Sequence, residues 1–564
     1  MSQLAGTPVL ILKEGSKREK GREAQHANIM AAQLVAAAVK SALGPKGMDK
    51  MLVDSFGDVT ITSDGRTILD EMDIQHPAAK MMVEVAKTQD EEVGDGTTTA
   101  VVVAGELLGK AETLIEKNVH PTVIIDGYRK ASWKALETLD KISISVKPKD
   151  KTFLKKVAMT SMASKLVADN SEHLAEIAAS AILHVTTATA KGFDADLDDI
   201  MVEKKPGESV VETRLIKGIV LDKEATHPGM PKRIENAKIA LLNSSLEIEK
   251  TEFDAKLNIE RPEQMEAFMK QEENMLRDMV KKVVKSGANV FICQKGIDDL
   301  AQHFLARGEI LAIRRAKKSD MEKLAKATGG NVITKLDELT AKDLGHAKLV
   351  EERKIGDDKM TFVEGCKNPR SVAILIRGGT ERIVDEAERS IHDALCVVRD
   401  VVQEPKIVAG GGAPELEIAR VLRDYADTLV GKEALAVRLY AEALEAVPLT
   451  LSENAGLDPI DVLSELRARH EKKQVWAGVN VQKGAVNDMK KLEVFEPTSV
   501  KKQIIKSATE AATMILKIDD IIASGKSKAP PMPPGGMPGG MPGGMPGGMP
   551  GGMGGGMPGG MGGY

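Results

Sequence analysis

The sequence has few of the residues that would indicate a nucleic-acid surface or a membrane span. Aromatic side chains make up only 3% of the 564 residues, and 78 basic side chains are balanced by 83 acidic ones. Base recognition needs aromatic side chains beside a basic face, so this composition argues against a nucleic-acid partner. No apolar run approaches the length of a membrane span, and the first residues lack the apolar core of a signal peptide. We therefore expect a cytoplasmic protein with neither a membrane nor a nucleic acid as partner.

Cysteine is also scarce, and Cys293, Cys366 and Cys396 lie far apart in the sequence. An odd number of scattered cysteines indicates neither a disulfide framework nor a zinc site. The histidines show no ligand spacing either. We expect the three cysteines to be buried thiols.

What the sequence does contain is a glycine-rich turn at residues 92–100 that opens an apolar helix. Gly94 and Gly96 bracket Asp95, and threonines follow at positions 97, 98 and 99. A helix start offers unpaired N–H groups and the positive end of a dipole, which suit a phosphate. Asp95 would repel phosphate unless a divalent cation lay between them. The turn matches neither GxxxxGK[ST] nor GxGxxG, and by itself such a turn is more often an ordinary loop with a good N-cap than a phosphate site.

Three other turns have a similar composition. Residues 43–52 form a second glycine-rich turn, which is either a helix terminator or a backbone cradle for phosphate or adenine. Asp64 follows a short strand at 59–62, where it could cap the next helix or face the same phosphates as Asp95. Residues 408–415 contain three consecutive glycines before another helix.

The helical and strand-forming patterns divide the chain into nested parts. Both ends are mainly helical, whereas the middle alternates strands with helices, which implies βαβ units and a partly parallel sheet. A domain with two insertions nested inside it would explain this order. Outside the middle we expect helices over 17–43, 97–118, 121–139, 382–403 and 499–522, and a hairpin between 476–481 and 492–497. The expected strands of the middle part are 237–242, 290–293, 310–313, 331–333 and 372–376.

A helix opened by Pro262 carries an apolar stripe inside the middle part. The stripe consists of Met265, Phe268, Met269, Leu276, Met279 and Val283. Such a stripe is ordinarily core, but methionine is common on adaptable binding surfaces. A protruding helix that closes over something or contacts a neighbour is therefore the alternative. The tail at 529–564 repeats Gly-Gly-Met-Pro without charge, and we expect it to be disordered.

Several of these segments, in this order, resemble the group II chaperonins, the family of the archaeal thermosome subunits. The matching segments are Leu43-Gly44-Pro45-Lys46-Gly47-Met48-Asp49-Lys50, Asp64-Gly65, Gly94-Asp95-Gly96-Thr97-Thr98, Gly410-Gly411-Gly412 and the Gly-Gly-Met tail. The resemblance implies a multidomain α and α/β fold with three domains. These are a mainly helical equatorial ATP-binding domain (1–148 and 405–528), a small intermediate hinge domain (149–217 and 371–404) and an α/β apical domain (218–370) whose helical protrusion at about 245–285 forms a lid.

The resemblance also implies partners and a reaction. Identical or paralogous subunits would form a stacked double ring that encloses non-native protein clients. Hydrolysis of ATP to ADP, with Mg²⁺, would drive closure of the lid. Without the resemblance, two other classes would fit the phosphate turns: a monomeric small-molecule kinase, and a passive scaffold that would not need Asp64 and Asp393.

Site roles carry over by resemblance, residue by residue. Nucleotide contacts would come from Leu43, Gly44, Pro45 and Ser164, phosphate contacts from Gly96, Thr97, Thr98 and Thr99, and ribose or base contacts from Gly411 and Glu496. Asp95 would bind Mg²⁺, and Lys165 would sense the γ-phosphate. Asp64 and Asp393 would orient the attacking water, Asp393 only after its domain moves. Ser63 stands where the family usually has Asn, which would weaken one hydrogen bond near the site.

Overall fold

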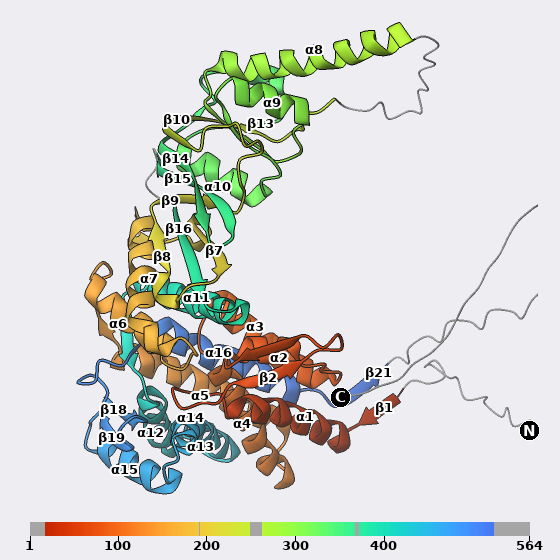
Figure 1. The fold of residues 1–564 in the computed structure, drawn as a ribbon. Helices are drawn as coiled ribbons and strands as arrows, with labels where there is room; N and C mark the ends of the chain where they lie inside the picture. Colours follow the sequence, from red (N-terminus) through yellow and green to blue (C-terminus); the bar gives the residue numbers. More distant parts are fainter. Residues whose placement is uncertain (1–16, 191, 249–261, 367–370, 524–564) are drawn as a thin grey trace, which may run out of the picture. The chain divides into compact units, whose positions relative to one another are not determined.

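The computed structural model describes residues 17–190, 192–248, 262–366 and 371–523 (Figure 1). Within these ranges Glu19–Asp520 form one compact unit. The polar loop expected before Pro262 and the glycine-rich tail at 529–564 lie outside the described residues. None of the helices in the described ranges is long and apolar enough to cross a membrane.

Helix α4 (Thr97–Glu116) is the centre of a helical bundle formed by early and late segments of the described chain. It packs against α1 (Arg22–Lys40), α3 (Pro77–Val93) and α16 (Thr498–Leu516). All residues of α4 from Thr97 to Gly105 are buried, as expected of a helix that is surrounded by others. The remaining helices of the bundle are α2 (Gly65–Glu71), α5 (Pro121–Ile142), α12 (Ala413–Asp427), α13 (Lys432–Leu444), α14 (Ala446–Asn454) and α15 (Pro459–Glu471).

Short strands accompany these helices. The pairs are β2 (Lys50–Val53) with β3 (Val59–Thr62), β18 (Ala477–Asn480) with β19 (Ala485–Asp488), and β17 (Lys406–Ala409) with both β4 (Ile144–Ser145) and β20 (Phe495–Pro497), all antiparallel. The first and last described strands are β1 (Lys17–Lys20) and β21 (Asp520–Ala523).

A small sheet follows in the order β7 (Ile200–Pro206), β16 (Val372–Gly378), β8 (Arg214–Ile216), with β16 parallel to β7. Helices α6 (Lys151–Met162), α7 (Ser171–Val185) and α11 (Glu381–Gln403) pack together beside it. Strand β16 joins two hydrophobic cores: Ile374 and Ile376 belong to the core of the helical bundle, and Ala373 and Leu375 to that of the larger sheet. This alternation follows from the two-residue period of a strand. A further hairpin pairs β5 (Thr187–Thr189) with β6 (Gly192–Asp194).

The larger sheet has seven strands and is partly parallel, as the alternating pattern predicted. Its order is β12 (Leu311–Ile313), β11 (Val290–Cys293), β10 (Arg233–Leu242), β14 (Gly345–Ile355), β15 (Asp358–Cys366), β9 (Gly218–Leu221), with β13 (Val332–Ile333) also on β10. The first three strands and β13 run parallel, and β14, β15 and β9 continue antiparallel. Helices α8 (Pro262–Ser286), α9 (Asp299–Arg307) and α10 (Lys318–Thr328) accompany this sheet, and α8 packs on α9 (Figure 1).

The apolar stripe of α8 divides into two halves. Leu276 and Val283 are buried in the core of the larger sheet, so the core interpretation is correct for the second half of the helix. Met265 and Met269 in the first half are 50% and 61% exposed. The first half therefore presents apolar side chains to solvent, as the alternative interpretation expected.

Three expected elements differ from the structure. Residues 477–480 pair with 485–488 and not with 492–497, because β20 instead joins β17. The last helix ends at Leu516 and a strand occupies 520–522, where we had expected helix to continue. At the other end, residues 17–20 form a strand before α1 begins at Arg22, so the helix predicted from residue 17 starts later.

Candidate functional site

The turn between α3 and α4 has the backbone that its glycines predicted. Gly94 and Gly96 are left-handed, with φ of 70° and 78°, a conformation that glycine adopts without the steric cost of a side chain. The carboxylate of Asp95 between them accepts a hydrogen bond from the N–H of Gly96 at 2.6 Å. Thr97, Thr98 and Thr99 form the buried first turn of α4. Their N–H groups belong to the helix start that a phosphate would favour.

Asp64 caps the neighbouring helix α2 and also reaches α4. Its Oδ2 atom accepts hydrogen bonds from the N–H and hydroxyl of Thr67 at 2.9 and 2.8 Å, and its Oδ1 atom accepts from the hydroxyl of Thr97 at 3.3 Å. A Cβ atom on Gly65 would lie 2.8 Å from the backbone nitrogen of Thr98, so the starts of the two helices touch at this glycine. The expectation that Asp64 caps the next helix is therefore confirmed, and the expectation that it faces the same phosphates as Asp95 stays a prediction.

Lys165 connects Asp64 with Asp393. Its Nζ atom lies 2.9 Å from Oδ2 of Asp393 and 3.7 Å from Oδ1 of Asp64, and all three side chains are buried. The lysine follows α6, the first aspartate caps α2 and the second belongs to α11. Asp393 thus lies beside Lys165 in this structure, and its expected approach to the phosphate after a domain movement stays a prediction.

The pKa values of the carboxylates in this cluster are set mainly by burial and by the charge of Lys165. Burial raises the pKa of Asp393, and the nearby charges of Asp64 and Asp95 raise it further, against the opposing effect of Lys165. Burial likewise raises the pKa of Asp95. For Asp64 burial acts in the same direction, but Lys165 and the hydrogen bonds from Thr67 and Thr97 outweigh it and the pKa is lowered. A cation added beside these carboxylates would relieve the repulsion.

Ser63 and Ser164 lie next to this cluster. The hydroxyl of Ser63 donates a hydrogen bond to the backbone carbonyl of Ser164 at 3.2 Å. The residue that departs from the family pattern therefore still makes a hydrogen bond, and it makes it to the segment that carries Lys165.

The Leu43-Gly44-Pro45 loop is fixed by α14. Asn454 donates a hydrogen bond to the carbonyl of Leu43 at 2.8 Å, and a Cβ atom on Gly44 would lie 2.3 Å from Cδ2 of Leu451. Pro45 is exposed. The same helix supports the third glycine turn, residues 408–415, because Pro448 packs against Gly412.

Gly411 and Glu496 lie on neighbouring segments. The carbonyl of Gly411 accepts a hydrogen bond from the N–H of Val479 at 2.9 Å. Glu496 lies on β20 opposite Val408, and its Oε1 atom is 2.9 Å from where a Cβ atom on Gly410 would be. Glycine at position 410 therefore leaves the space that the carboxylate of Glu496 occupies.

Sequence reasoning missed two buried charged residues beside Glu496. Lys501 lies 2.6 Å from Oε2 of Glu496 and 2.8 Å from Oε1 of Glu415. Glu415 ends the third glycine turn and could have been noticed there, but a single lysine in a helical pattern resembles any solvent-facing lysine.

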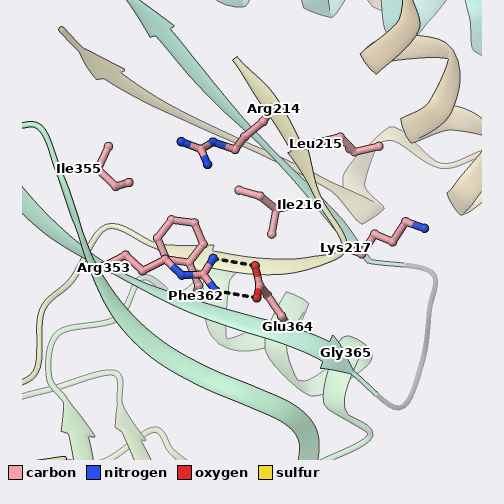
Figure 2. Close-up of a pocket in the computed structure, with 9 residues that line it drawn as sticks. All are labelled: Arg214, Leu215, Ile216, Lys217, Arg353, Ile355, Phe362, Glu364 and Gly365. Carbon is pink, nitrogen blue, oxygen red and sulfur yellow. Dashed lines mark hydrogen bonds and ion pairs between the residues drawn. The ribbon is translucent and has the colours of Figure 1, made fainter. Parts of the chain in front are cut away.

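A hollow of about 330 Å³, lined by residues 214–217 and by strands β14 and β15, contains none of these residues (Figure 2). There Arg353 donates to both oxygens of Glu364 at 2.8 Å, and its guanidinium lies 4.6 Å from the ring centroid of Phe362. Arg353 is thus already paired with neighbouring side chains of the hollow. The buried carboxylates that would suit a cation lie around Lys165 instead.

The sequence profile of the TCP-1/cpn60 chaperonin family matches residues 35–526, which include all of the candidate site residues described above. The chain belongs to this chaperonin family. A thermosome subunit of Pyrococcus horikoshii is 58% identical to this chaperonin over 526 residues, which are 93% of this chain and 96% of the relative. Thermosome subunit alpha of Archaeoglobus fulgidus is 56% identical over 539 residues, 95% of this chain and 99% of the relative.

A solved structure gives the same result for the fold. It is the open-state monomer of a group II chaperonin from Methanococcoides burtonii, which is 44% identical with a TM-score of 0.58 and covers 76% of this chain and 100% of its own. The expected multidomain α and α/β fold of a group II chaperonin is therefore confirmed.

Among the described residues of this chaperonin, no group of three or more His, Cys, Asp or Glu side chains is arranged to hold a metal ion.

Proposed function

We propose that this chaperonin chain hydrolyses ATP and uses the hydrolysis to enclose and help fold non-native proteins. The observation that carries the proposal is the position of Lys165 between Asp64 and Asp393, next to the start of α4. The cluster combines three features. These are a helix start that suits phosphate, the ammonium group of Lys165, and two carboxylates on separate elements. Phosphoryl transfer needs little more than positioning and neutralisation of charge.

The proposed contacts follow the three glycine turns. Gly96, Thr97, Thr98 and Thr99 bind the phosphates with backbone N–H and hydroxyl groups. Leu43, Gly44 and Pro45, with Ser164, contact the nucleotide, and Gly411 and Glu496 bind the ribose and base. The nucleotide supplies the phosphoanhydride bond that is broken.

Asp95 is the proposed ligand of a magnesium ion. Mg²⁺ is usually bound by one or two carboxylates together with substrate phosphates and water, and a single aspartate at a phosphate-binding helix start fits that pattern. The raised pKa of Asp95, which follows from its burial, also fits a carboxylate that is ionised best beside a cation.

Asp64 and Asp393 orient the attacking water and accept its proton, and Lys165 interacts with the terminal phosphate. Because Asp393 is on α11 and Asp64 caps α2, hydrolysis depends on how these two elements approach each other. A movement of α11 would therefore switch the reaction on or off.

The proposed domains are those that the resemblance implies. Residues 1–148 and 405–528 form the equatorial domain, 149–217 and 371–404 the intermediate domain, and 218–370 the apical domain. The exposed first half of α8 belongs to the proposed lid. We further propose that copies of this chain, or paralogous chains, assemble into a stacked double ring in the cytoplasm.

Replacing Asp393 tests this proposal. In Asp393→Ala we expect the ATP dissociation constant to change by no more than a few-fold, because the glycine-rich turn at residues 92–100 is intact. The rate of phosphate release should fall by about 100-fold or more. Calorimetry measures binding, and a phosphate assay measures turnover. Unchanged turnover in the variant would overturn the assignment, and absence of ATP binding in the unmodified chain would overturn the proposed function.

A further inference from the structure

Lys501 is buried between two carboxylates at the end of the site where the ribose is proposed to bind. Its Nζ atom is 2.6 Å from Oε2 of Glu496 and 2.8 Å from Oε1 of Glu415, and only 6% of the residue is exposed. The three residues come from α16, β20 and α12. One ammonium group therefore ties together three elements around the third glycine turn.

The first two turns of α16 also pack against the glycine-rich turn at residues 92–100, the phosphate turn. A Cβ atom on Gly96 would lie 2.8 Å from Cδ1 of Ile504 and 3.1 Å from Cγ1 of Val500, which flank Lys501 on this helix. Gln89 donates a hydrogen bond to the carbonyl of Asp95 at 2.9 Å. The start of α16 thus lies against the phosphate turn and next to the carboxylate of Glu496.

We propose that Lys501 is a positioning residue that fixes Glu496 to accept a hydrogen bond from a sugar hydroxyl, so that the site selects ribonucleotides over deoxyribonucleotides. The inference rests on the proposed nucleotide site and adds to it the residue that determines sugar selectivity.

The geometry assigns one task to each oxygen of Glu496. Lys501 anchors Oε2, which leaves Oε1 against the side-chain-free backbone of Gly410, 2.9 Å from where its Cβ would be. Without an anchor on Oε2, the carboxylate could rotate away from the sugar. An ordered carboxylate is the better acceptor, because its orientation does not have to be fixed when the ligand binds.

Charge leads to the same conclusion. Glu415 is only 4% exposed and is close to Glu496, so removing Lys501 would leave two buried carboxylates facing each other without a cation. Either carboxylate would then bind a proton or turn outward. A protonated or displaced Glu496 would no longer offer the sugar the same charged acceptor.

Binding of Mg-ADP, Mg-2′-deoxy-ADP and Mg-3′-deoxy-ADP to the full chain provides the test, since these products are not hydrolysed further. We expect the unmodified chain to prefer ADP over at least one deoxy form by about tenfold or more, the selectivity of a hydrogen bond to a charged group. In Lys501→Met this preference should fall to about twofold or less. A preference that stays at its original value in Lys501→Met would overturn the inference.

The adjacent lysine supplies a matched control. Lys502 also pairs with two carboxylates, at 2.9 Å from Asp140 and 2.8 Å from Glu404, but it does not contact Glu496. Lys502→Met should keep the sugar preference, and its loss there would overturn the inference because selectivity would then follow general stability. If Lys501→Met does not fold, the milder Lys501→Gln should lower the preference, and an unchanged value in that variant would equally overturn it. A chain that binds none of the three nucleotides would instead contradict the proposed function.

Discussion

Both buried lysines of the site have two carboxylate partners. A buried ammonium group is costly unless it is paired, and Lys165 and Lys501 each bridge two acidic side chains from different elements. Such a lysine links elements that are far apart in the sequence. Only one of the two lysines was identified from the sequence. Lys165 lies in a recognised motif, whereas nothing adjacent in the sequence marks Lys501 as buried.

Gly94 is a residue at which a single methyl group should have a large effect. A Cβ atom there would lie 2.2 Å from Cβ of Cys396 on α11, and the residue has a φ of 70°. We expect Gly94→Ala to lower the free energy of unfolding by about 2–4 kcal/mol, from the left-handed backbone and from overpacking together. Denaturant unfolding measures it.

Gly456→Ala is the control for this prediction, because Gly456 has a φ of 72° but no atom near the added methyl group. It should lose only about 1 kcal/mol from backbone strain. Equal losses in the two variants would show that contact with Cys396 is unimportant.

Glu203 on β7 should make stability depend on pH. Burial raises its pKa to about 7, with Asp320 and Asp222 adding to the effect of burial against Lys317. From about pH 4.5 to 7 the folded chain then binds more protons than the unfolded chain, so stability falls as the pH rises through this window. Glu203→Gln should be more stable than the unmodified chain at pH 8, by on the order of 1 kcal/mol, and equal to it near pH 4.

Denaturant unfolding at several pH values measures this difference. A constant difference between Glu203→Gln and the unmodified chain across the pH range would contradict the prediction.

Elements with a clear period were predictable, and elements whose pairing depends on distant residues were not. The apolar repeat of α4 and the buried strands β11 and β16 were identified close to their observed bounds. The hairpin near residue 480 was paired with the wrong strand, because sequence alone does not show that β17 offers 495–497 an edge. Strand β14 was missed because charged residues such as Glu351 and Arg353 pair on its surface and hide its pattern.

Substitutions of Asp64 can separate its role as the cap of helix α2 from its proposed role in ATP hydrolysis. Asparagine caps a helix about as well as aspartate, whereas alanine does not. Asp64→Ala should therefore be about 1 kcal/mol less stable than Asp64→Asn, while both variants should hydrolyse ATP slowly. Thermal or denaturant unfolding and phosphate release distinguish the two effects. Normal turnover in Asp64→Asn would show that this residue only caps the helix.

The candidate site as a whole was predictable in its parts but not in its connections. The motifs located Asp64, Asp95, Lys165, Asp393 and Glu496 on separate segments. The contacts between them, such as that of Lys165 with Asp393, depend on the packing of α6, α11 and the bundle, which no local pattern contains.

Assembly is the prediction that concerns the whole molecule. A chain of 60.5 kDa that acts as a small-molecule kinase would elute near its own mass or as a small oligomer, whereas a double ring would elute at many times that mass. We expect the ring, and gel filtration followed by electron microscopy of the peak would show it. Elution as a monomer at micromolar concentration would rule out the enclosed chamber.

The packing of α16 has a consequence for how the chain is made. This helix ends at Leu516 and covers α3, α4 and α5, which are synthesised hundreds of residues earlier. On the ribosome, those early helices must wait for their last neighbour with apolar surface uncovered. A growing subunit thus exposes the kind of apolar surface that the finished assembly is proposed to enclose. It is therefore itself a chain that must be protected from aggregation until α16 has been synthesised.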